Sequence, residues 1–236
     1  MATNYNPRIV TDGLVLALDA GNTKSYPGSG TTWTDLSGNG NNGTLTNMDG
    51  ANLDSANGGS LTFDGTDEYI QLSTTTLLRA SSTISAWINI DDFTTGKPSG
   101  TGRVFIMNSS VTFTSMIAFY NGGYSFETDT NSNPHEIAGR TTGNVSSSAI
   151  SAGSWFHFSL VFDSNTFYGY VNGVLTGSAS LANDLFFNRI GDGSAFADNY
   201  PAYMKGKISN FTVYNRALTA SEVKQNFNAT RSRFGI

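Results

Sequence analysis

Apolar residues recur in short runs with a period of two along most of the chain. In residues 83–90 (TISAWINI) the apolar side chains alternate with Ser85, Trp87 and Asn89. Such alternation is typical of a β-strand that buries one face. Runs of similar character occupy residues 13–20, 60–63, 69–72, 104–107, 116–120, 124–127, 155–163, 166–171, 185–190 and 207–214. Many short strands at this spacing predict an all-β sandwich or barrel.

Turn residues lie where these strands should reverse. The dipeptide Asn-Gly occurs at 39–40, 42–43, 57–58, 121–122 and 172–173. Both residue types accept the positive φ that type I′ hairpin turns require. We therefore expect tight hairpins at 121–122 and 172–173, where strand-like residues lie on both sides.

One helix is indicated, near the C-terminus. Thr219 is a suitable N-cap residue, and Glu222 follows it at the capping-box spacing. We expect Leu218, Val223 and Phe227 to dock this short helix on the sandwich.

The chain shows no internal repeat and no linker that would divide it. We predict one domain over residues 12–229, an N-terminal arm over 1–11 and a C-terminal tail over 230–236. A length of 236 residues suits one large β-sandwich. The chain has no cysteine, which excludes disulfides and thiolate metal sites.

Charge and targeting signals narrow the function classes. The net charge is −5, and the 13 lysines and arginines are scattered. Binding to nucleic acid through phosphate neutralisation is therefore not expected. The N-terminus lacks the apolar region of a signal peptide, and no run of residues is apolar enough for a membrane helix. We expect synthesis in the cytoplasm and no membrane insertion.

Four stretches together resemble the laminin-G-like (LamG) jelly-roll family of the concanavalin A-like lectin and glucanase superfamily. Their order and spacing match that family from about residue 12 to residue 228. They are GLVLALD at 13–19 with DLSGNGNNGT at 35–44, LTFDG at 61–65 with DEYI at 67–70, ISAWI at 84–88, and a last group from GSWFH at 153–157 through YVNGV at 170–174 and IG at 190–191 to VYNRAL at 213–218.

The resemblance implies an all-β, two-sheet antiparallel jelly-roll sandwich with one short C-terminal helix. Its first and last strands should be neighbours. The chain also resembles the branch of this family found as virion proteins of tailed bacteriophages, through its GLVLALDAGN opening, its SGNGNNGT loop and its QNFNATRSRFG ending. This implies a virion location in capsid decoration, a neck appendage or a tail fibre. Such appendages are commonly symmetric, so we expect a dimer or trimer.

Catalysis is not expected. Glucanases of this superfamily carry Glu-x-Asp-x-x-Glu on one strand, and glycosidic cleavage needs two carboxylates. The nearest match is Glu127-Thr-Asp129-Thr-Asn-Ser132, in which serine replaces the second glutamate. His157 is expected to be a hydrogen-bonded residue of a strand, and His135 a solvated loop residue.

A structural calcium ion is the cofactor to consider, because relatives often carry one near the first loops. Calcium takes oxygen ligands from carboxylates, amides and carbonyls. The simpler interpretation is that the Asp and Asn side chains of the first loops cap turns. In addition, serine and asparagine at 209–210 stand where the family usually has acidic residues in its last strand, which removes a potential carboxylate ligand. The candidate ligands are Asp19, Asn22, Asp35, Asn39 and Asn41.

Carbohydrate binding needs exposed aromatic rings together with amides and charged groups that orient hydroxyls. Tyr168 and Tyr170 should share one face of a strand. Packing in the core is the alternative for the tyrosines, because sandwich interiors are rich in aromatic rings. The candidate residues are Tyr120, Asn121, Tyr124, His135, Arg140, Tyr168 and Tyr170.

We therefore expect a non-enzymatic virion protein of a tailed phage that displays a lectin-like domain. Its ends, including the apolar tip Phe234–Ile236, would contact other virion proteins, and the domain would bind host surface glycans. The alternatives are a carbohydrate-binding module without a virion role and a polysaccharide hydrolase or lyase.

Overall fold

The computed structural model describes residues 8–78, 81–93, 103–107, 115–120, 123–128, 141–180, 185–194 and 203–236.

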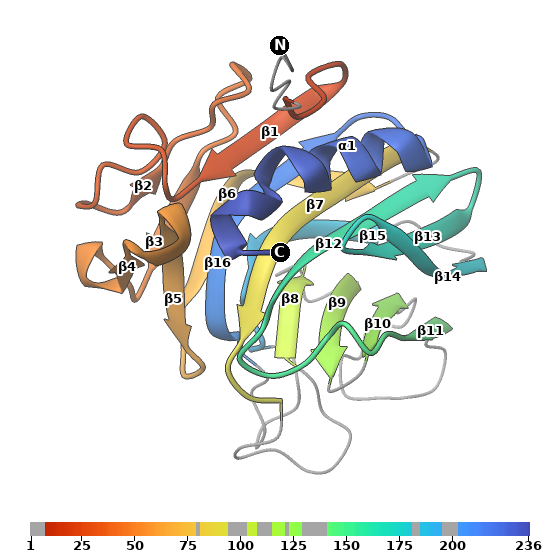
Figure 1. Ribbon diagram of the computed structural model, residues 1–236. Coiled ribbons are helices and arrows are strands. Elements are labelled where there is room, and N and C mark those ends of the chain that lie inside the picture. The colour runs from red at the N-terminus through yellow and green to blue at the C-terminus, as the bar shows by residue number, and fades with distance from the viewer. Residues whose placement is uncertain are drawn as a thin grey trace.

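Two eight-stranded antiparallel sheets face each other as a sandwich (Figure 1). Sheet A has the order β14 (Val174–Ser180), β13 (Thr166–Val171), β12 (Trp155–Asp163), β7 (Ser81–Ile90), β16 (Lys205–Tyr214), β5 (Ser60–Asp64) and β4 (Leu53–Asp54), with β1 (Leu14–Asp19) also paired to β16. Sheet B has the order β11 (Thr141–Ser146), β10 (Gly123–Thr128), β9 (Ser115–Tyr120), β8 (Arg103–Met107), β15 (Leu185–Ile190), β6 (Tyr69–Leu78), β3 (Gly43–Thr46) and β2 (Thr32–Trp33).

The long strand β16 organises sheet A. One edge pairs with β7 along its length, while the other edge pairs with β5 over residues 205–208 and with β1 over residues 210–214. The first and last strands are therefore neighbours, and the predicted jelly-roll sandwich is confirmed.

The core lies between the sheets because each strand of sheet A alternates its side chains. On β12, Phe156 and Phe158 point inward and are fully buried. The ring of Phe158 lies 4.9 Å from the ring centroids of both Phe119 and Tyr124. On β7, Ile84 is one of the alternating apolar side chains that face the same core, as the sequence pattern predicts.

The turns follow the expected chemistry in part. Asn172 and Gly173 have φ values of 53° and 73°, so the tight turn between β13 and β14 is confirmed. Gly43 instead begins β3, where an added Cβ would lie 2.6 Å from Ile70 Cγ2. That glycine is required by packing rather than by a turn. The expected hairpin at 121–122 lies outside the described residues.

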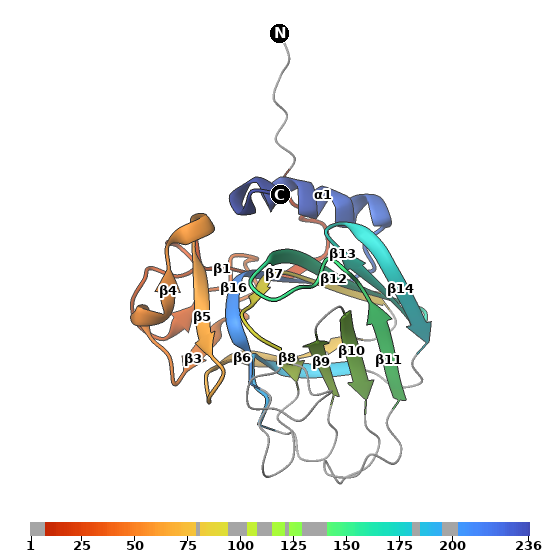
Figure 2. The ribbon, with the colours of Figure 1, turned by 60° about the horizontal axis from the view of Figure 1, so that its bottom comes forward.

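The helix α1 (Ala220–Thr230) lies across the outer face of sheet A, on the side away from sheet B (Figure 2). Its predicted capping box is confirmed, since Thr219 and Glu222 cap each other. Leu218, Val223 and Phe227 are buried, as expected for the docking face. A 3₁₀ turn, η3 (Arg231–Phe234), continues the covering segment, and two more, η1 (Gly50–Asn52) and η2 (Ala56–Gly58), flank β4. Among the described helices, none is long and apolar enough to cross a membrane.

The predicted N-terminal arm and C-terminal tail both contain residues that pack against the domain. Val10, in the predicted arm, is buried and its backbone N–H donates to Asn226 of α1. Phe234, in the predicted tail, is only 8% exposed. Of the apolar tip expected to contact other virion proteins, Phe234 packs within its own chain, whereas Ile236 is 42% exposed.

Candidate functional site

The outer face of sheet A is polar and aromatic, yet it is largely covered. Trp87 of β7 is fully buried there. Its ring stacks on Phe234 at a centroid distance of 4.0 Å and on Phe227 at 5.7 Å. Its indole N–H donates to Thr230 Oγ1 at 2.7 Å. The C-terminal segment therefore forms a second layer that seals part of this face.

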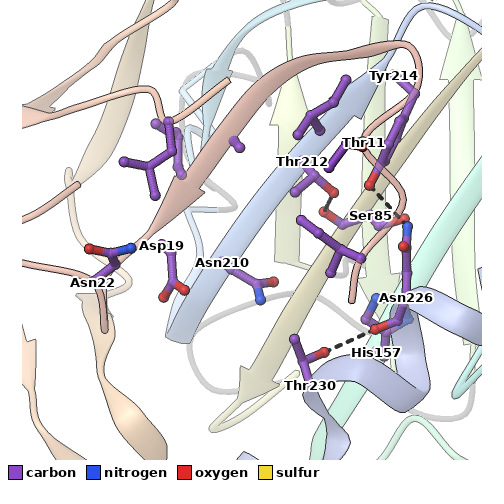
Figure 3. Close-up of a pocket in the computed structure, with 15 residues that line it drawn as sticks. Thr11, Asp19, Asn22, Ser85, His157, Asn210, Thr212, Tyr214, Asn226 and Thr230 are labelled. Carbon is purple, nitrogen blue, oxygen red and sulfur yellow. Dashed lines mark hydrogen bonds between the residues drawn. The ribbon is translucent and has the colours of Figure 1, made fainter. Parts of the chain in front are cut away.

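Beside this cover, a pocket of about 360 Å³ opens between β1 and α1 (Figure 3). Its size falls at the low end of the roughly 300–1,000 Å³ typical of small-molecule sites. The pocket draws on segments from both ends of the chain and from the middle strands of sheet A. It is lined by Ile9, Thr11, Leu14, Ala17, Leu18, Asp19, Asn22, Leu36, Ser85, His157, Asn210, Thr212, Tyr214, Asn226 and Thr230.

The floor of the pocket is formed by outward side chains of β16 and β7. The pairing of these strands shifts register between Ile208 and Asn210. Asn210 Oδ1 accepts a hydrogen bond from the backbone N–H of Trp87 at 3.2 Å, and within the described part of the chain the Asn210 amide nitrogen has no partner. Thr212 Oγ1 donates to the carbonyl of Ser85 at 3.3 Å. One amide N–H₂ group on this floor therefore remains available to a ligand.

His157 contributes an imidazole to the same pocket. The side chain is 3% exposed, with ring centroids 5.3 Å from Trp87 and 6.0 Å from Phe227. Among the described residues its Nδ1 has no hydrogen-bond partner. Burial lowers the pKa of His157 to about 3, so the ring is neutral near neutral pH. The expected hydrogen-bonded histidine is confirmed only for its backbone, which exchanges hydrogen bonds with Asn172.

Asp19, one of the lining residues, belongs to an ion pair that we call the clasp. The carboxylate of Asp19 pairs with the guanidinium of Arg233 at 3.1 Å. Arg233 also donates to the carbonyl of Gly58 at 2.9 Å and to Ser209 Oγ at 3.0 Å. Among the described residues that line the pocket, Asp19 is the one that carries a charge, and this clasp neutralises it.

The predicted calcium ligands do not fit a shared cation site. Each carboxylate oxygen of Asp35 accepts two hydrogen bonds, from the N–H groups of Ala17, Ser37 and Asn41 and from the Ser37 hydroxyl. The carboxylate of Asp19 instead forms an ion pair with Arg233, and the positive charge of this arginine would repel a metal ion. Calcium needs several oxygens that are free to coordinate it.

The asparagines of the predicted calcium set serve the backbone. Asn22 Oδ1 accepts from the N–H of Lys24, and the side-chain amides of Asn39 and Asn41 donate to the carbonyls of Leu14 and Val15. Within the described residues no cluster of three or more acidic or histidine side chains could hold a metal. These contacts agree with the simpler interpretation that the loop residues stabilise turns.

The predicted carbohydrate-binding residues do not converge within the described part of the chain. Tyr124 is fully buried in the core, and its hydroxyl lies over Gly169 and 3.1 Å from Thr176 Oγ1. The prediction that its ring is exposed for stacking is therefore wrong. Tyr168 and Tyr170 do share a face, as expected, but it is the outer face of sheet A near α1, and Tyr170 is 7% exposed.

The remaining members of that set cannot be placed. Tyr120 belongs to β9, with its side chain outside the described atoms. Asn121, His135 and Arg140 lie outside the described residues. The same holds for the acidic motif considered for catalysis, because the Glu127 side chain and the residues at 129–132 are not described.

Two other glutamates have structural partners. Glu68 is 7% exposed and accepts hydrogen bonds from Asn52 and from the backbone of Asp64, and burial raises its pKa. Glu222 forms a two-point pair with Arg216, which lowers the pKa of Glu222 to about 2. Both carboxylates are explained by the local structure that they stabilise.

Residues 64–224 match the family Laminin_G_3, described as the concanavalin A-like lectin/glucanases superfamily. The match covers more than half of the chain, so the chain belongs to this family, as its motifs predict. The comparison with curated proteins gives no match.

Solved structures share the fold at low sequence identity. Domain 4 of AbnA, an extracellular arabinanase from Geobacillus stearothermophilus solved with arabinotriose, has a TM-score of 0.63 and 19% identity over 90% of this chain and 97% of that chain. The binding domain of Paraclostridial Mosquitocidal Protein 1 has a TM-score of 0.63 and 17% identity over 93% and 52%.

A third structure is the binding domain of Botulinum neurotoxin DC in complex with rat synaptotagmin II. It has a TM-score of 0.64 and 17% identity over 94% of this chain and 52% of that chain. The chain thus spans about half the length of the toxin binding domains and nearly all of the arabinanase domain. At these identities the likeness concerns the fold.

Proposed function

We propose that this chain is a non-catalytic, lectin-like module that binds a glycan through its outer-face pocket. The observation that carries the proposal is the pocket itself, where the amide nitrogen of Asn210 has no hydrogen-bond partner among the described residues. Membership of a lectin and glucanase superfamily supports it. The arabinanase domain, solved with a bound arabino-oligosaccharide, supports it by analogy of fold.

The non-catalytic part of the proposal rests on the carboxylates. Hydrolysis of a glycosidic bond needs an acid and a second carboxylate on opposite sides of the bond. The motif at 127–132 lacks its second glutamate. Asp19 is paired with Arg233, and no other described residue of the lining carries a carboxylate. The proposal therefore predicts binding without release of reducing ends.

A glycan array probed with the full chain tests this function, with and without added calcium. Binding to a defined set of glycans in both conditions, and no reducing ends released from the same glycans, is the expected result. Absence of binding across the array and across insoluble polysaccharides would overturn the proposal. Binding only with calcium would show that a metal takes part in recognition, against the poor fit of the Asp35 loop.

A more specific setting for this module is the virion of a tailed phage. The observation in favour is the joint presence of the GLVLALDAGN opening and the QNFNATRSRFG ending. Capsid or tail proteins would be its partners, and self-association would multiply weak glycan contacts. Mass spectrometry of purified particles tests this setting, and absence of the chain from them would exclude it while leaving glycan binding intact.

A further inference from the structure

We propose that the pocket between β1 and α1 holds one uncharged sugar ring, which lies beside His157 and whose hydroxyls bind the Asn210 amide nitrogen. This inference rests on the proposed glycan-binding function and adds the class of ligand and its contacts. Three features of the pocket support it: a lining that is partly apolar and partly polar, a polar group without a hydrogen-bond partner, and a carboxylate that is already paired.

The pocket has two kinds of wall. Ile9, Leu14 and Leu36 contribute apolar surface, and Leu36 is 39% exposed. Asn210 and Thr212 contribute an amide and a hydroxyl from β16 (Figure 3). A sugar ring has the same division, since its C–H groups are apolar and its hydroxyls point outward. A purely apolar ligand would leave the polar floor without hydrogen bonds, at a cost in free energy.

The unpaired groups suit hydroxyls. The Asn210 amide nitrogen can donate two hydrogen bonds, and a neutral imidazole can donate one and accept one. A hydroxyl both donates and accepts, so it matches either group. His157 is 3% exposed, and its Nδ1 has no partner among the described residues. That atom is closed off from solvent, so the Asn210 amide nitrogen is the group that meets a ligand hydroxyl directly.

The charge of the lining selects an uncharged ligand. Of the lining residues that the structure describes, only Asp19 is charged, and its carboxylate is already paired with Arg233. An acidic sugar would place a second carboxylate beside Asp19 and would compete for the same guanidinium. A cationic ligand would have to displace Arg233, which also holds Gly58 and Ser209. Neutral hexoses, pentoses and N-acetylated hexosamines meet neither obstacle.

The experiment uses two variants of the full chain with matched controls. Ala17→Leu fills the pocket from β1 without removing a hydrogen bond, and Ala51→Leu makes the same change at an exposed site outside the lining. Asn210→Asp keeps the oxygen that accepts from Trp87 but replaces the free N–H₂ group. Asn165→Asp makes the same charge change at an exposed turn. Thermal unfolding of each variant checks that it folds.

Binding is measured by saturation-transfer NMR titration with L-arabinose, D-galactose, D-glucose and N-acetyl-D-glucosamine, and with N-acetylneuraminic acid and D-glucuronic acid as acidic probes. We expect at least one neutral sugar to bind, with affinity reduced roughly tenfold or more by Ala17→Leu and by about tenfold by Asn210→Asp, as for one lost hydrogen bond. The two controls should bind like the parent chain.

Three outcomes would overturn the inference. If neutral sugars bind and Ala17→Leu leaves their affinity unchanged, the sugar lies elsewhere and only the general glycan-binding function survives. If the acidic sugars bind in the pocket as tightly as the neutral ones, the selection by charge is wrong. If neither the monosaccharides nor the glycan array gives any binding, the proposed function fails together with the inference.

Discussion

The two faces of sheet A are buried by different partners, although the same strands supply both. The inner face packs its apolar side chains, such as Phe158, against sheet B. The outer face packs Trp87 and His157 against the C-terminal helix and the turn that follows it. Phe158 and Trp87 are both fully buried, so the faces differ in chemistry rather than in exposure.

This difference explains where the candidate site lies. Apolar side chains on the inner face need only close packing. The outer face also buries polar atoms, and each of these must find a partner or remain unsatisfied. Among the polar atoms of this face that have no partner in the described part of the chain are His157 Nδ1 and Asn89 Oδ1. The Asn210 amide nitrogen lines the pocket, and it is the polar group of this face that we propose a ligand binds.

At neutral pH, the largest effect of a single substitution should come from the inner face. Phe158→Ala removes a ring that contacts Phe105, Phe119 and Tyr124. We expect a loss of about 4 kcal/mol in the free energy of unfolding, because the cavity adds to the lost burial. Urea denaturation measures it, with Ser178→Ala on exposed β14 as the control. A loss below about 1 kcal/mol would mean that the core tolerates the cavity, against the packing seen here.

The outer cover should contribute less. Phe234→Ala removes the ring stacked on Trp87 at 4.0 Å, and we expect a loss of about 2 kcal/mol because the site is near the chain end and can relax. Trp87 should become more exposed, so tryptophan fluorescence should shift to longer wavelength. Ile236→Ala is the control, since that side chain is already 42% exposed. An unchanged spectrum would show that η3 does not cover Trp87 in solution.

His157 should make stability depend on pH. Its folded pKa of about 3 lies below the ordinary histidine value of 6.5, so between these pH values the unfolded state binds a proton that the folded state does not. Stability is therefore complete above pH 6.5 and falls as the pH drops toward 3, by up to ~1.4 kcal/mol per pH unit. His157→Phe keeps a ring against Trp87 and should flatten this slope in urea titrations at several pH values. An identical slope in both proteins would exclude His157 as its source.

The clasp between Asp19 and Arg233 should give the smallest effect. Both side chains are partly exposed, at 29% and 24%, so solvent screens the pair. We expect a coupling free energy of about 1 kcal/mol in a double-mutant cycle with alanine, above that of a simple surface pair because several hydrogen bonds converge. The comparable pair of Lys207 and Asp54 is the control. Equal coupling in both pairs would show that the additional contacts to Gly58 and Ser209 add nothing.

Much of the fold could be predicted because local patterns carried it. The alternation in residues 83–90 and 155–163 predicted two central strands, and Asn172-Gly173 predicted their neighbouring hairpin. The capping box at Thr219 and Glu222 predicted the start of the helix. Period, turn chemistry and capping are properties of a few adjacent residues, so the sequence shows them directly.

Little of the candidate site could be predicted. Its signal in the sequence is weak, since the outward polar residues Asn210 and Thr212 resemble those of any half-exposed strand. The tyrosines were the stronger signal, yet Tyr124 is in the core. A tyrosine at the edge of a core can bury its ring while its hydroxyl makes a hydrogen bond, so the residue type alone does not reveal whether the ring is exposed.

The sequence by itself determined the class of fold, the paired first and last strands and the absence of disulfides, because strand period, family motifs and composition are all encoded locally. The tertiary structure decided what covers the outer face of sheet A. The N–H of Val10 reaches Asn226, and Arg233 reaches Asp19, across more than 200 residues in each case. Such contacts depend on where the two chain ends meet in space, so the pocket between them exists only in the folded molecule.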